Sequence, residues 1–437
     1  MIETIRNAWK VEDLRKKMLF TLFIIVLFRF GATIPVPYID TAQMKSYYAQ
    51  MSGTFFGYLN LMSGGAFSQG TLFAMSISPY INASIIIQLL TVAIPALERL
   101  SKEGDEGRKK LNNYTRYLTV GIALLQGYGF YATLRSYGVI ITPSALTALV
   151  FVVTLSAGTA LLMWLADQIN VYGIGNGISI ILFAGIVSRA PATVSSMIGY
   201  VTQGYLDLEL EVVKKLNPFV AIAIAVGAVL LVSLVVIVTN AERRVPVQYA
   251  KRVVGRKVYG GQSTHIPIKV NGTGVLPVIF AQSFLSIPST IAFFFPASNP
   301  EGFWATFLKA FRFDHPIYAL LYTLLIVGFS FFYISMTYNP VEIANNLKKN
   351  GGFVPGIRPG RPTSEYIARI LNKITFFGSW FLVFIAILPI ITTWFLPGGI
   401  NISLGGTTII ILVGVALETV KQMESMMLMR HYKGFLE

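Results

Sequence analysis

Few side chains in this sequence have the types and spacing that chemistry requires. The chain has no cysteine, so it offers neither a disulfide nor a thiolate nucleophile. Its three histidines, His265, His315 and His431, are too scattered to predict a metal site. The run "GIGNGIS" at 173–179 follows no strand-like segment, and no GxSxG, Walker or HExxH motif occurs. These observations disfavour an enzyme.

Carboxylates are also scarce in the apolar parts of the chain. Asp167 and Glu98 lie near the ends of apolar segments, and Glu418 lies in the last one. A transporter driven by a proton gradient usually carries buried titratable groups, so this scarcity disfavours a proton relay. A sodium site built from backbone and hydroxyl oxygens stays open at this point.

The most informative polar residues lie inside an apolar stretch, "MSISPYINASIIIQLL" at 75–90. This stretch is apolar enough to cross a membrane, yet Pro79 lies near its start, and Asn82, Ser84 and Gln88 lie among its isoleucines. Polar side chains inside a membrane mark contacts between helices or a water-filled path. The residues alone leave both interpretations open.

The composition places the whole chain in a membrane. Of its 437 residues, 54% are hydrophobic and 13% are charged, whereas a soluble globular protein carries roughly 25% charged residues. A membrane-spanning helix requires ~20 mostly apolar residues. Ten candidate spans lie near 18–35, 74–94, 114–135, 145–167, 176–200, 217–239, 274–297, 315–338, 374–396 and 406–424.

The distribution of charge supports an even number of spans with both termini in the cytoplasm. The net charge is +15, and Lys and Arg accumulate on cytoplasmic loops. With ten spans, most basic residues fall on one side: on both tails and on the loops after spans two, six and eight. The first apolar run follows a basic start and has no clear cleavage site, so we interpret it as a retained span.

Two loops on this basic side are long. In the loop at about 240–273, "RRVPVQYA" and "HIPIKV" alternate apolar and polar residues, which predicts a β-hairpin. The loop at about 339–370 opens with the helical pattern "VEIANNLKK" and ends in Pro/Gly turn chemistry. Long loops in compact proteins are often functional.

The segment between the first two spans is apolar but broken by Gly57, Gly64, Gly65 and Gly70. Irregular backbone at membrane depth persists only inside protein or beside water. We therefore expect a short re-entrant helix at about 55–62, followed by a glycine hinge. A disordered external loop is the alternative.

Four motifs, in chain order, resemble the SecY family: "PYINASIIIQLL", "GRKKLNNYTRY", "GIGNGISIILFAGIV" and "NNLKKNGGFVPGIRPG". The resemblance extends essentially from end to end. It implies an all-α integral membrane protein with ten transmembrane helices, a re-entrant plug helix and a cytoplasmic β-hairpin loop. The helices would form two pseudo-symmetric five-helix halves, 1–200 and 201–437, related as inverted repeats.

The resemblance also implies a function. The family forms a protein-conducting channel that translocates unfolded secretory polypeptides and releases transmembrane segments sideways into lipid. We expect no cofactor, no metal and no catalysis, because SecA, a translating ribosome and the proton motive force supply the energy. SecE and SecG are the expected partner subunits, and signal peptides are bound in transit. The expected location is the bacterial cytoplasmic (inner) membrane, with many spans and both termini cytoplasmic.

Residue by residue, the resemblance assigns candidates to four parts of this channel. The pore ring matches Ile77, Ile81, Ile178, Leu182, Ile279 and Ile411, with Leu182 where the family often has isoleucine. The plug, at about 55–67, includes Phe55, Phe56, Leu59, Leu61, Met62, Gly64, Gly65 and Phe67. The lateral gate includes Asn82, Ile85, Gln88, Gln282 and Ser283. The surface that docks SecA or the ribosome includes Arg358, Arg243, Arg244, Lys251, Arg252, Arg256 and Lys257.

The pore-ring residues suit a gate that must let any sequence pass. A narrow apolar constriction disfavours water and ions and gates by dewetting, and aliphatic side chains make no directional bonds. Ile77 and Ile81 are four residues apart, as are Ile178 and Leu182, so each pair shares a helix face. Ordinary packing or lipid contact is the alternative for these residues, and orientation alone is the alternative for the basic loops. A secondary transporter with a midplane site is the rival class.

Overall fold

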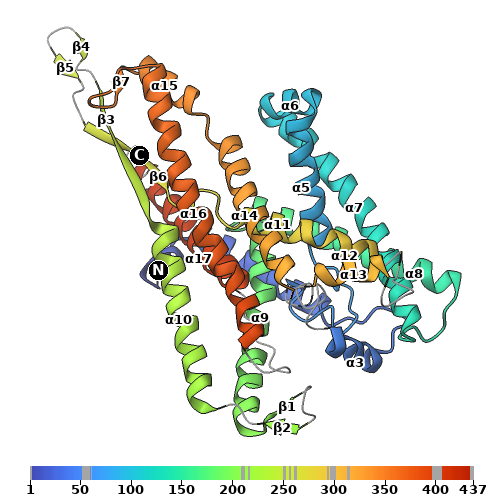
Figure 1. Cartoon of the computed structure of the whole chain (residues 1–437). Helices are drawn as coiled ribbons and strands as arrows, with labels where there is room; N and C mark the ends of the chain where they lie inside the picture. Colours follow the sequence, from blue (N-terminus) through green and yellow to red (C-terminus); the bar gives the residue numbers. More distant parts are fainter. Residues whose placement is uncertain are drawn as a thin grey trace.

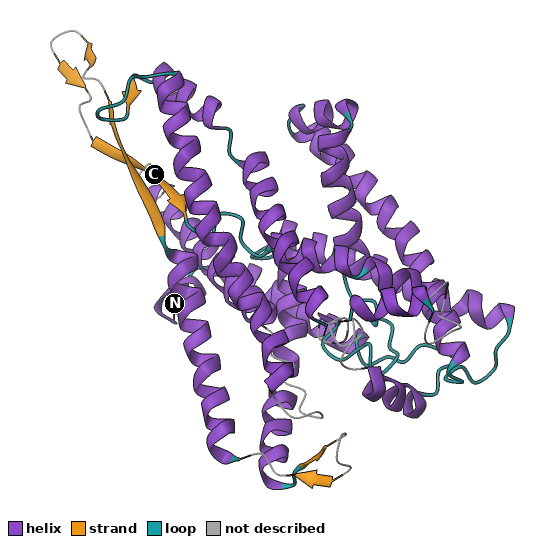
Figure 2. Cartoon of the chain, viewed as in Figure 1, coloured by secondary structure: helices purple, strands orange, loops and turns teal. Residues whose placement is uncertain are grey.

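A computed structural model describes residues 2–51, 60, 62–207, 212–214, 217–249, 252–254, 257–259, 263–292, 295, 302–312, 315–395 and 406–433. Helices make up most of this part of the chain, and the strands are short or form hairpins (Figures 1 and 2). The helices are α1 (Ile2–Lys10), α2 (Glu12–Gly31), α3 (Thr41–Met51), α5 (Ser78–Ala93), α6 (Pro95–Lys102), α7 (Asp105–Ser136), α8 (Ala145–Tyr172), α9 (Gly177–Thr202), α10 (Pro218–Asn240), α11 (Leu276–Leu285), α12 (Ile287–Ala292), α13 (Phe303–Ala310), α14 (Pro316–Thr337), α15 (Pro340–Lys349), α16 (Arg361–Phe395) and α17 (Gly406–Lys433). The strands are β1 (Tyr205–Asp207), β2 (Val212–Lys214), β3 (Glu242–Tyr249), β4 (Arg252–Val254), β5 (Lys257–Tyr259), β6 (Ser263–Lys269) and β7 (Gly352–Phe353).

A helix lies at each of the ten ranges that were expected to span the membrane. Among the described residues, five helices (α8, α9, α10, α14 and α16) are individually long and apolar enough to cross a bilayer. The number becomes six if α5 and α6, which meet at a bend of 103°, count as one span. The structure thus confirms a helical protein with several apolar spans, and the number ten stays a prediction.

Helix α5 explains why a proline begins an apolar span. Pro79 occupies the first turn of the helix, where its missing N–H would have no partner in any case. Helix α5 has 16 residues, which corresponds to roughly 24 Å at 1.5 Å per residue. This length is shorter than the ~30 Å hydrocarbon core of a bilayer. The expected span began at 74, whereas residues before Ser78 form turns.

The "GIGNG" motif ends α8 and starts α9. Asn176 caps α9, and its side-chain oxygen accepts hydrogen bonds from the N–H groups of Ile178 and Ser179. At Gly177, an added Cβ would lie 1.9 Å from the carbonyl oxygen of Ala166, so only glycine allows the two helices to approach here. The motif therefore joins two packed helices, which agrees with the prediction against a nucleotide loop.

Two large apolar clusters hold the helices together. One contains buried residues of α2, α8, α9 and α17, together with the turns at 62–77. The other is built from α10, α11, α14, α16 and α17. Helix α17 contributes to both clusters, so it joins the earlier and later parts of the chain.

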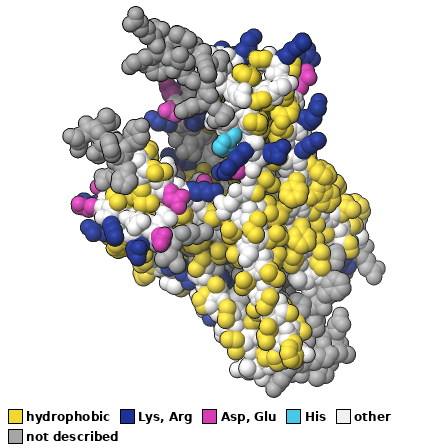
Figure 3. All heavy atoms as spheres, turned by 90° about the vertical axis from the view of Figure 1, so that its left-hand side faces the viewer, with side chains coloured by type: hydrophobic (Ala, Val, Ile, Leu, Met, Phe, Trp, Pro, Cys, Tyr) yellow, Lys and Arg dark blue, Asp and Glu magenta, His cyan; other side chains and the backbone are white. Residues whose placement is uncertain are grey.

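Helix α10 shows that part of the apolar surface faces outward. Among its residues, Val235 is buried, and most of the others are exposed or half-buried. Figure 3 shows the face on which this helix lies: hydrophobic side chains cover its middle and lower parts, and most of the visible Lys and Arg lie in the upper half. Exposed apolar side chains on this scale fit a lipid-facing surface.

The two long loops expected on the basic side form one unit. Strands β3 and β6 make the predicted antiparallel hairpin, with Val245 opposite Ile266, and β7 adds to the other edge of β3. A separate apolar cluster joins the hairpin to α15 and the start of α16 through Val247, Leu347 and Ile367. In Figure 1 this unit and α6 lie at the top, whereas β1, β2 and α3 lie at the bottom. The arrangement agrees with the alternation of loops inferred from charge.

Candidate functional site

The six residues matched to a pore ring come together in one apolar cluster. Four helices supply them: α5 with the residue that precedes it, α9, α11 and α17. Three of the six are buried and three are partly buried and pack against the same cluster. The buried ones are Ile77, Leu182 and Ile411, and the partly buried ones are Ile81, Ile178 and Ile279. The structure thus gathers residues that are up to 334 positions apart in the sequence (from 77 to 411), and their role as a ring stays a proposal.

Local structure explains where the pairs Ile77 and Ile81, and Ile178 and Leu182, lie on their helices. The carbonyl oxygen of Ile77 accepts the N–H of Ile81 at 3.0 Å, so the two residues are one helical turn apart at the start of α5. Ile178 is the second residue of α9, directly after the cap formed by Asn176, and Leu182 follows one turn later. Both pairs therefore lie at the beginning of a helix, next to loops that fix where the helix starts.

The candidate plug is described only in part. Phe55, Phe56, Leu59 and Leu61 lie outside the described residues, as does most of the expected re-entrant helix. The remaining members, Met62, Gly64, Gly65 and Phe67, are buried. Met62 belongs to the same cluster as the pore-ring candidates. The Phe67 ring stacks on Phe130 with centroids 4.9 Å apart, which ties the segment to α7 as well.

A tight polar turn supports this part of the segment. Asn60 is fully buried, and its side-chain oxygen accepts the N–H of Ser68 at 2.8 Å while its carbonyl accepts the N–H of Gly65 at 2.8 Å. Gly64 and Gly65 have φ angles of +66° and +95°, a conformation that glycine adopts without steric cost. The predicted glycine hinge is therefore an ordered turn packed inside protein.

The residues matched to a lateral gate lie on α5 and α11, which contact one another. Ile85 and Gln282 are buried, and Asn82, Gln88 and Ser283 are half-buried. The Gln88 side chain donates to Ser84 Oγ at 3.3 Å within its own helix. Two helices that contact one another thus carry these polar residues, and a lateral gate between them stays a proposal.

Arg358 is exposed on a turn of fixed shape. Gly356 and Gly360 adopt left-handed φ angles of +81° and +104° on either side of it. The Thr363 hydroxyl donates to the carbonyl of Arg358 at 2.9 Å. Strand β7, which leads into this turn, pairs with β3 and so anchors the turn to the hairpin.

The other basic residues assigned to the docking surface differ in their position and in their ion pairing. Arg243 and Arg244 are exposed on β3, and Arg244 Nε lies 2.7 Å from Glu242 Oε1, so part of its charge is compensated. Arg252 and Lys257 lie in β4 and β5, whereas Lys251 and Arg256 lie outside the described residues. Sequence reasoning treated these cations as equivalent and could not detect the pairing within β3.

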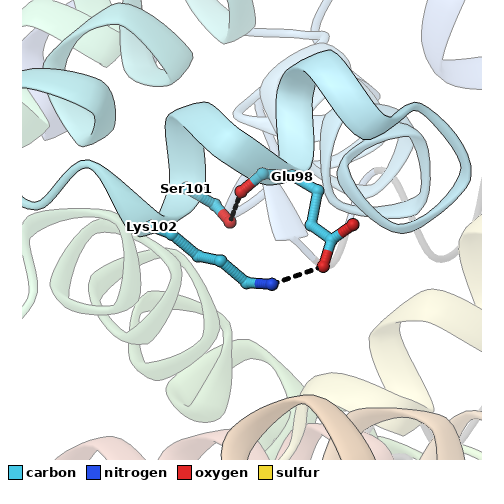
Figure 4. Close-up of polar contacts among 3 residues, drawn as sticks. All are labelled: Glu98, Ser101 and Lys102. Atoms are coloured by element: carbon cyan, nitrogen blue, oxygen red, sulfur yellow. Dashed lines mark hydrogen bonds and ion pairs between the residues drawn. The ribbon is translucent and has the colours of Figure 1, made fainter.

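Two of the three carboxylates in or near the apolar segments, Asp167 and Glu98, form ion pairs with basic residues. Asp167 on α8 pairs with Arg116 on α7 at 2.6 Å. At the end of α6, Glu98 Oε1 lies 2.6 Å from Lys102 Nζ, and Ser101 donates to the Glu98 carbonyl (Figure 4). The hydrogen bond from Lys102 lowers the pKa of Glu98. Within the described part of the chain, no three His, Cys, Asp or Glu side chains form a group that could hold a metal ion.

Sequence reasoning missed the contacts of Arg29, the one basic residue inside the apolar run of α2. Its guanidinium donates to the carbonyl of Gly64 at 3.1 Å and to Ser188 Oγ at 2.9 Å. The signal was present, because an arginine within a span must find polar partners. The identity of those partners, 35 and 159 residues away, required the structure.

Comparison with known proteins shows the family. A family model named SecY matches residues 71–420. The chain is 46% identical over 452 aligned residues to the protein translocase subunit SecY of Streptomyces galbus, with both chains covered completely. The chain belongs to the SecY family. It is also 43% identical over 440 aligned residues to the protein translocase subunit SecY of Halalkalibacterium halodurans, again over the full length of both chains.

Solved structures show the SecY fold. One is a SecY channel whose plug domain is described as stabilising the closed state; it matches with a TM-score of 0.61 and 20% identity over 94% of this chain and 92% of that one. Another is the Sec61 channel in a canine ribosome complex, with a TM-score of 0.55 and 18% identity over 94% and 92% of the two chains. At such identities the likeness concerns the fold alone.

Proposed function

We propose that this SecY-family chain forms the channel through which unfolded secretory polypeptides cross the bacterial cytoplasmic membrane. The observation that carries the proposal is the convergence of six aliphatic side chains, from α5, α9, α11 and α17, in one apolar cluster. A narrow aliphatic constriction excludes water and ions. It also makes no directional bond that would select one passing side chain over another.

The segment at 55–67 is proposed as the plug. In support, Met62 packs in the same cluster as the constriction, and Phe67 is buried. The seam between α5 and α11 is proposed as the lateral gate, since polar groups interrupt the apolar surface there. Separating two helices joined by weak polar contacts requires little free energy, because water can solvate the polar groups. A hydrophobic helix can then pass between them into the lipid.

We also propose two halves, 1–200 and 201–437, with both termini in the cytoplasm. The boundary falls two residues before the end of α9, and β1 follows it. The unit of β3, β6, β7 and α15 would then lie at the cytoplasmic entrance, where its exposed cations suit acidic protein surfaces and RNA phosphates. SecA and the ribosome are the proposed occupants, with Arg358 at the centre of the contact, and SecE and SecG are the proposed partner subunits.

The chain is proposed to act without catalysis of its own. The six residues proposed for the constriction are all isoleucine or leucine, which carry no group that could act as an acid, a base or a nucleophile. A secondary transporter would instead place polar ligands and half-helix ends around a midplane site. The apolar constriction favours the channel over that rival.

Reconstitution tests the proposal. The chain is placed in proteoliposomes with SecE and SecG, and SecA, ATP and a secretory precursor are added outside. We expect the precursor to become protected from protease in an ATP-dependent manner, and protection to disappear when detergent is added. Liposomes with SecE and SecG alone are the control. Precursor that stays fully accessible with the complete set of components would contradict the proposal.

A further inference from the structure

Arg29 reaches from an apolar helix to the turn at 63–65, which lies within the candidate plug. One guanidinium nitrogen, Nη1, donates both to the carbonyl of Gly64 at 3.1 Å and to Ser188 Oγ at 2.9 Å. Hydrogen bonds from a charged donor are roughly twice as strong as neutral ones. Arg29 thus links three elements: α2, the turn at 63–65 and α9.

Helix α9 is shaped to receive this turn. The Ser188 hydroxyl donates to the carbonyl of Gly185 at 2.6 Å, which leaves its oxygen as the acceptor for Arg29. An added Cβ at Gly185 would lie 2.6 Å from the carbonyl oxygen of Met62. An added Cβ at Gly64 would lie 2.7 Å from Ser188 Oγ. Glycine at both positions therefore permits the close approach on which the hydrogen bonds depend.

A further contact connects the turn to the constriction. Ser76 donates its hydroxyl to the carbonyl of Met62 at 3.3 Å. Its φ angle of +51° is uncommon for a residue other than glycine, so tertiary contacts must hold it. The next residue is Ile77, a member of the proposed ring. The carbonyl of Met62 thus accepts a hydrogen bond from Ser76, just before α5, and the carbonyl of Gly64 accepts one from Arg29 of α2.

We propose that Arg29 and Ser188 form a latch that holds the turn at 63–65, a described part of the candidate plug, against α2 and α9 when the channel is closed. The inference rests on the proposed function and deepens it by naming the positioning residues of the closed state. Displacement of the turn must break the hydrogen bond from the Arg29 guanidinium to the carbonyl of Gly64, while the bond to Ser188 holds the guanidinium in place to make it. The vacated guanidinium would then face the opened path, where water can solvate it.

Thiol labelling measures how often the latch opens. The chain has no native cysteine, and Ser63 is fully buried in the turn, so Ser63→Cys reports displacement of the turn. The rate of reaction with a membrane-impermeant maleimide is measured in proteoliposomes that contain the chain with SecE and SecG. Arg29→Met, Ser188→Ala and both together are compared in the Ser63→Cys background.

We expect Arg29→Met to raise the labelling rate by about tenfold or more, because a charged hydrogen bond is lost. Ser188→Ala should raise it less, because the bond from Arg29 to Gly64 remains. The double variant should match Arg29→Met, since Arg29→Met already removes the bond to Ser188. Arg29→Lys should restore most of the slow labelling, because it keeps a cationic donor. Arg135→Met, at an exposed position at the end of α7, is the matched control and should not change the rate.

Unchanged labelling in both Arg29→Met and Ser188→Ala would overturn the latch. If Arg29→Met does not fold, as judged by its melting temperature, then Ser188→Ala and Arg29→Lys decide the question. The translocation of a precursor by the wild-type complex is measured in the same proteoliposomes. A failure there would contradict the proposed function, whereas normal translocation with unchanged labelling would reject the latch alone.

Discussion

At the scale of single residues, the proposed ring depends on aliphatic side chains at helical spacing, and both features can be read from the sequence. The spacing of Ile77 and Ile81, and of Ile178 and Leu182, was sufficient to predict two shared faces. The sequence could not show that these faces meet. Contact between α5, α9, α11 and α17 depends on the positions and angles at which helices far apart in the sequence pack together. It also did not reveal that, of two exposed arginines, Arg244 is paired with Glu242 whereas Arg358 lies on a turn of fixed shape.

The difference between these two arginines leads to a prediction. We expect Arg358→Glu to lower the initial rate of SecA-driven translocation at least tenfold, because an exposed cation on a rigid turn is replaced by an anion. Arg244→Glu should lower it only two- to threefold, since the charge of Arg244 is already compensated within β3. The rates are measured in proteoliposomes at saturating ATP. Equal losses from both variants would show that the cations act only through net charge.

At the scale of elements, long and regular segments were predictable and their junctions were not. The hairpin of β3 and β6 was visible as alternation, and α15 was visible as a helical pattern, to which the structure adds Asn339 as the capping residue. The start of α5 was misplaced by four residues, because Ser76 adopts a left-handed conformation that its sequence context does not signal. The expected span at 176–200 is one continuous helix, although Pro191 lies inside it at an exposed position.

Close packing of α8 on the turn before α5 gives a prediction at this scale. An added Cβ at Gly158 would lie 2.2 Å from the carbonyl oxygen of Leu72, so backbone must shift to accept it. We expect Gly158→Ala to destabilise the protein by about 1–3 kcal/mol. Gly121→Ala on α7 is the matched control, because no atom lies within 4 Å of the added methyl group. Thermal unfolding of both variants in detergent measures the difference, and equal melting temperatures would contradict the assigned contact.

At the scale of the whole molecule, the alternation of basic and less basic loops predicts which loops share one side of the membrane, and that assignment stays a prediction. The unit formed by β3, β6, β7 and α15 was predictable only as two separate loops. The pairing of β7 with β3 joins segments about a hundred residues apart, and no local pattern encodes such a pairing. Once formed, the unit holds the Arg358 turn against the hairpin.

Because the two loops share one apolar cluster, we expect a substitution in the β3 strand to affect the loop at 339–370 as well. Val247 is fully buried in the cluster shared by the hairpin, α15 and α16. We expect Val247→Ala to destabilise the unit by about 1–3 kcal/mol and to increase protease cleavage within 339–360. Val226→Ala, at an exposed position on α10, should leave cleavage unchanged. Cleavage that rises in neither variant would show that the two loops fold independently.

The central claim is that a secretory polypeptide passes through the constriction formed by α5, α9, α11 and α17. Single cysteines at Ile81, Ile178 and Ile411 test it, because the chain has no native cysteine. A control cysteine is placed at Val229, which is 66% exposed on the outer face of α10. A precursor with one cysteine is stalled in transit, and disulfide crosslinks are scored. We predict crosslinks from all three ring positions and none from Val229, whereas absent crosslinks at the ring, or equal crosslinks at Val229, would contradict the account.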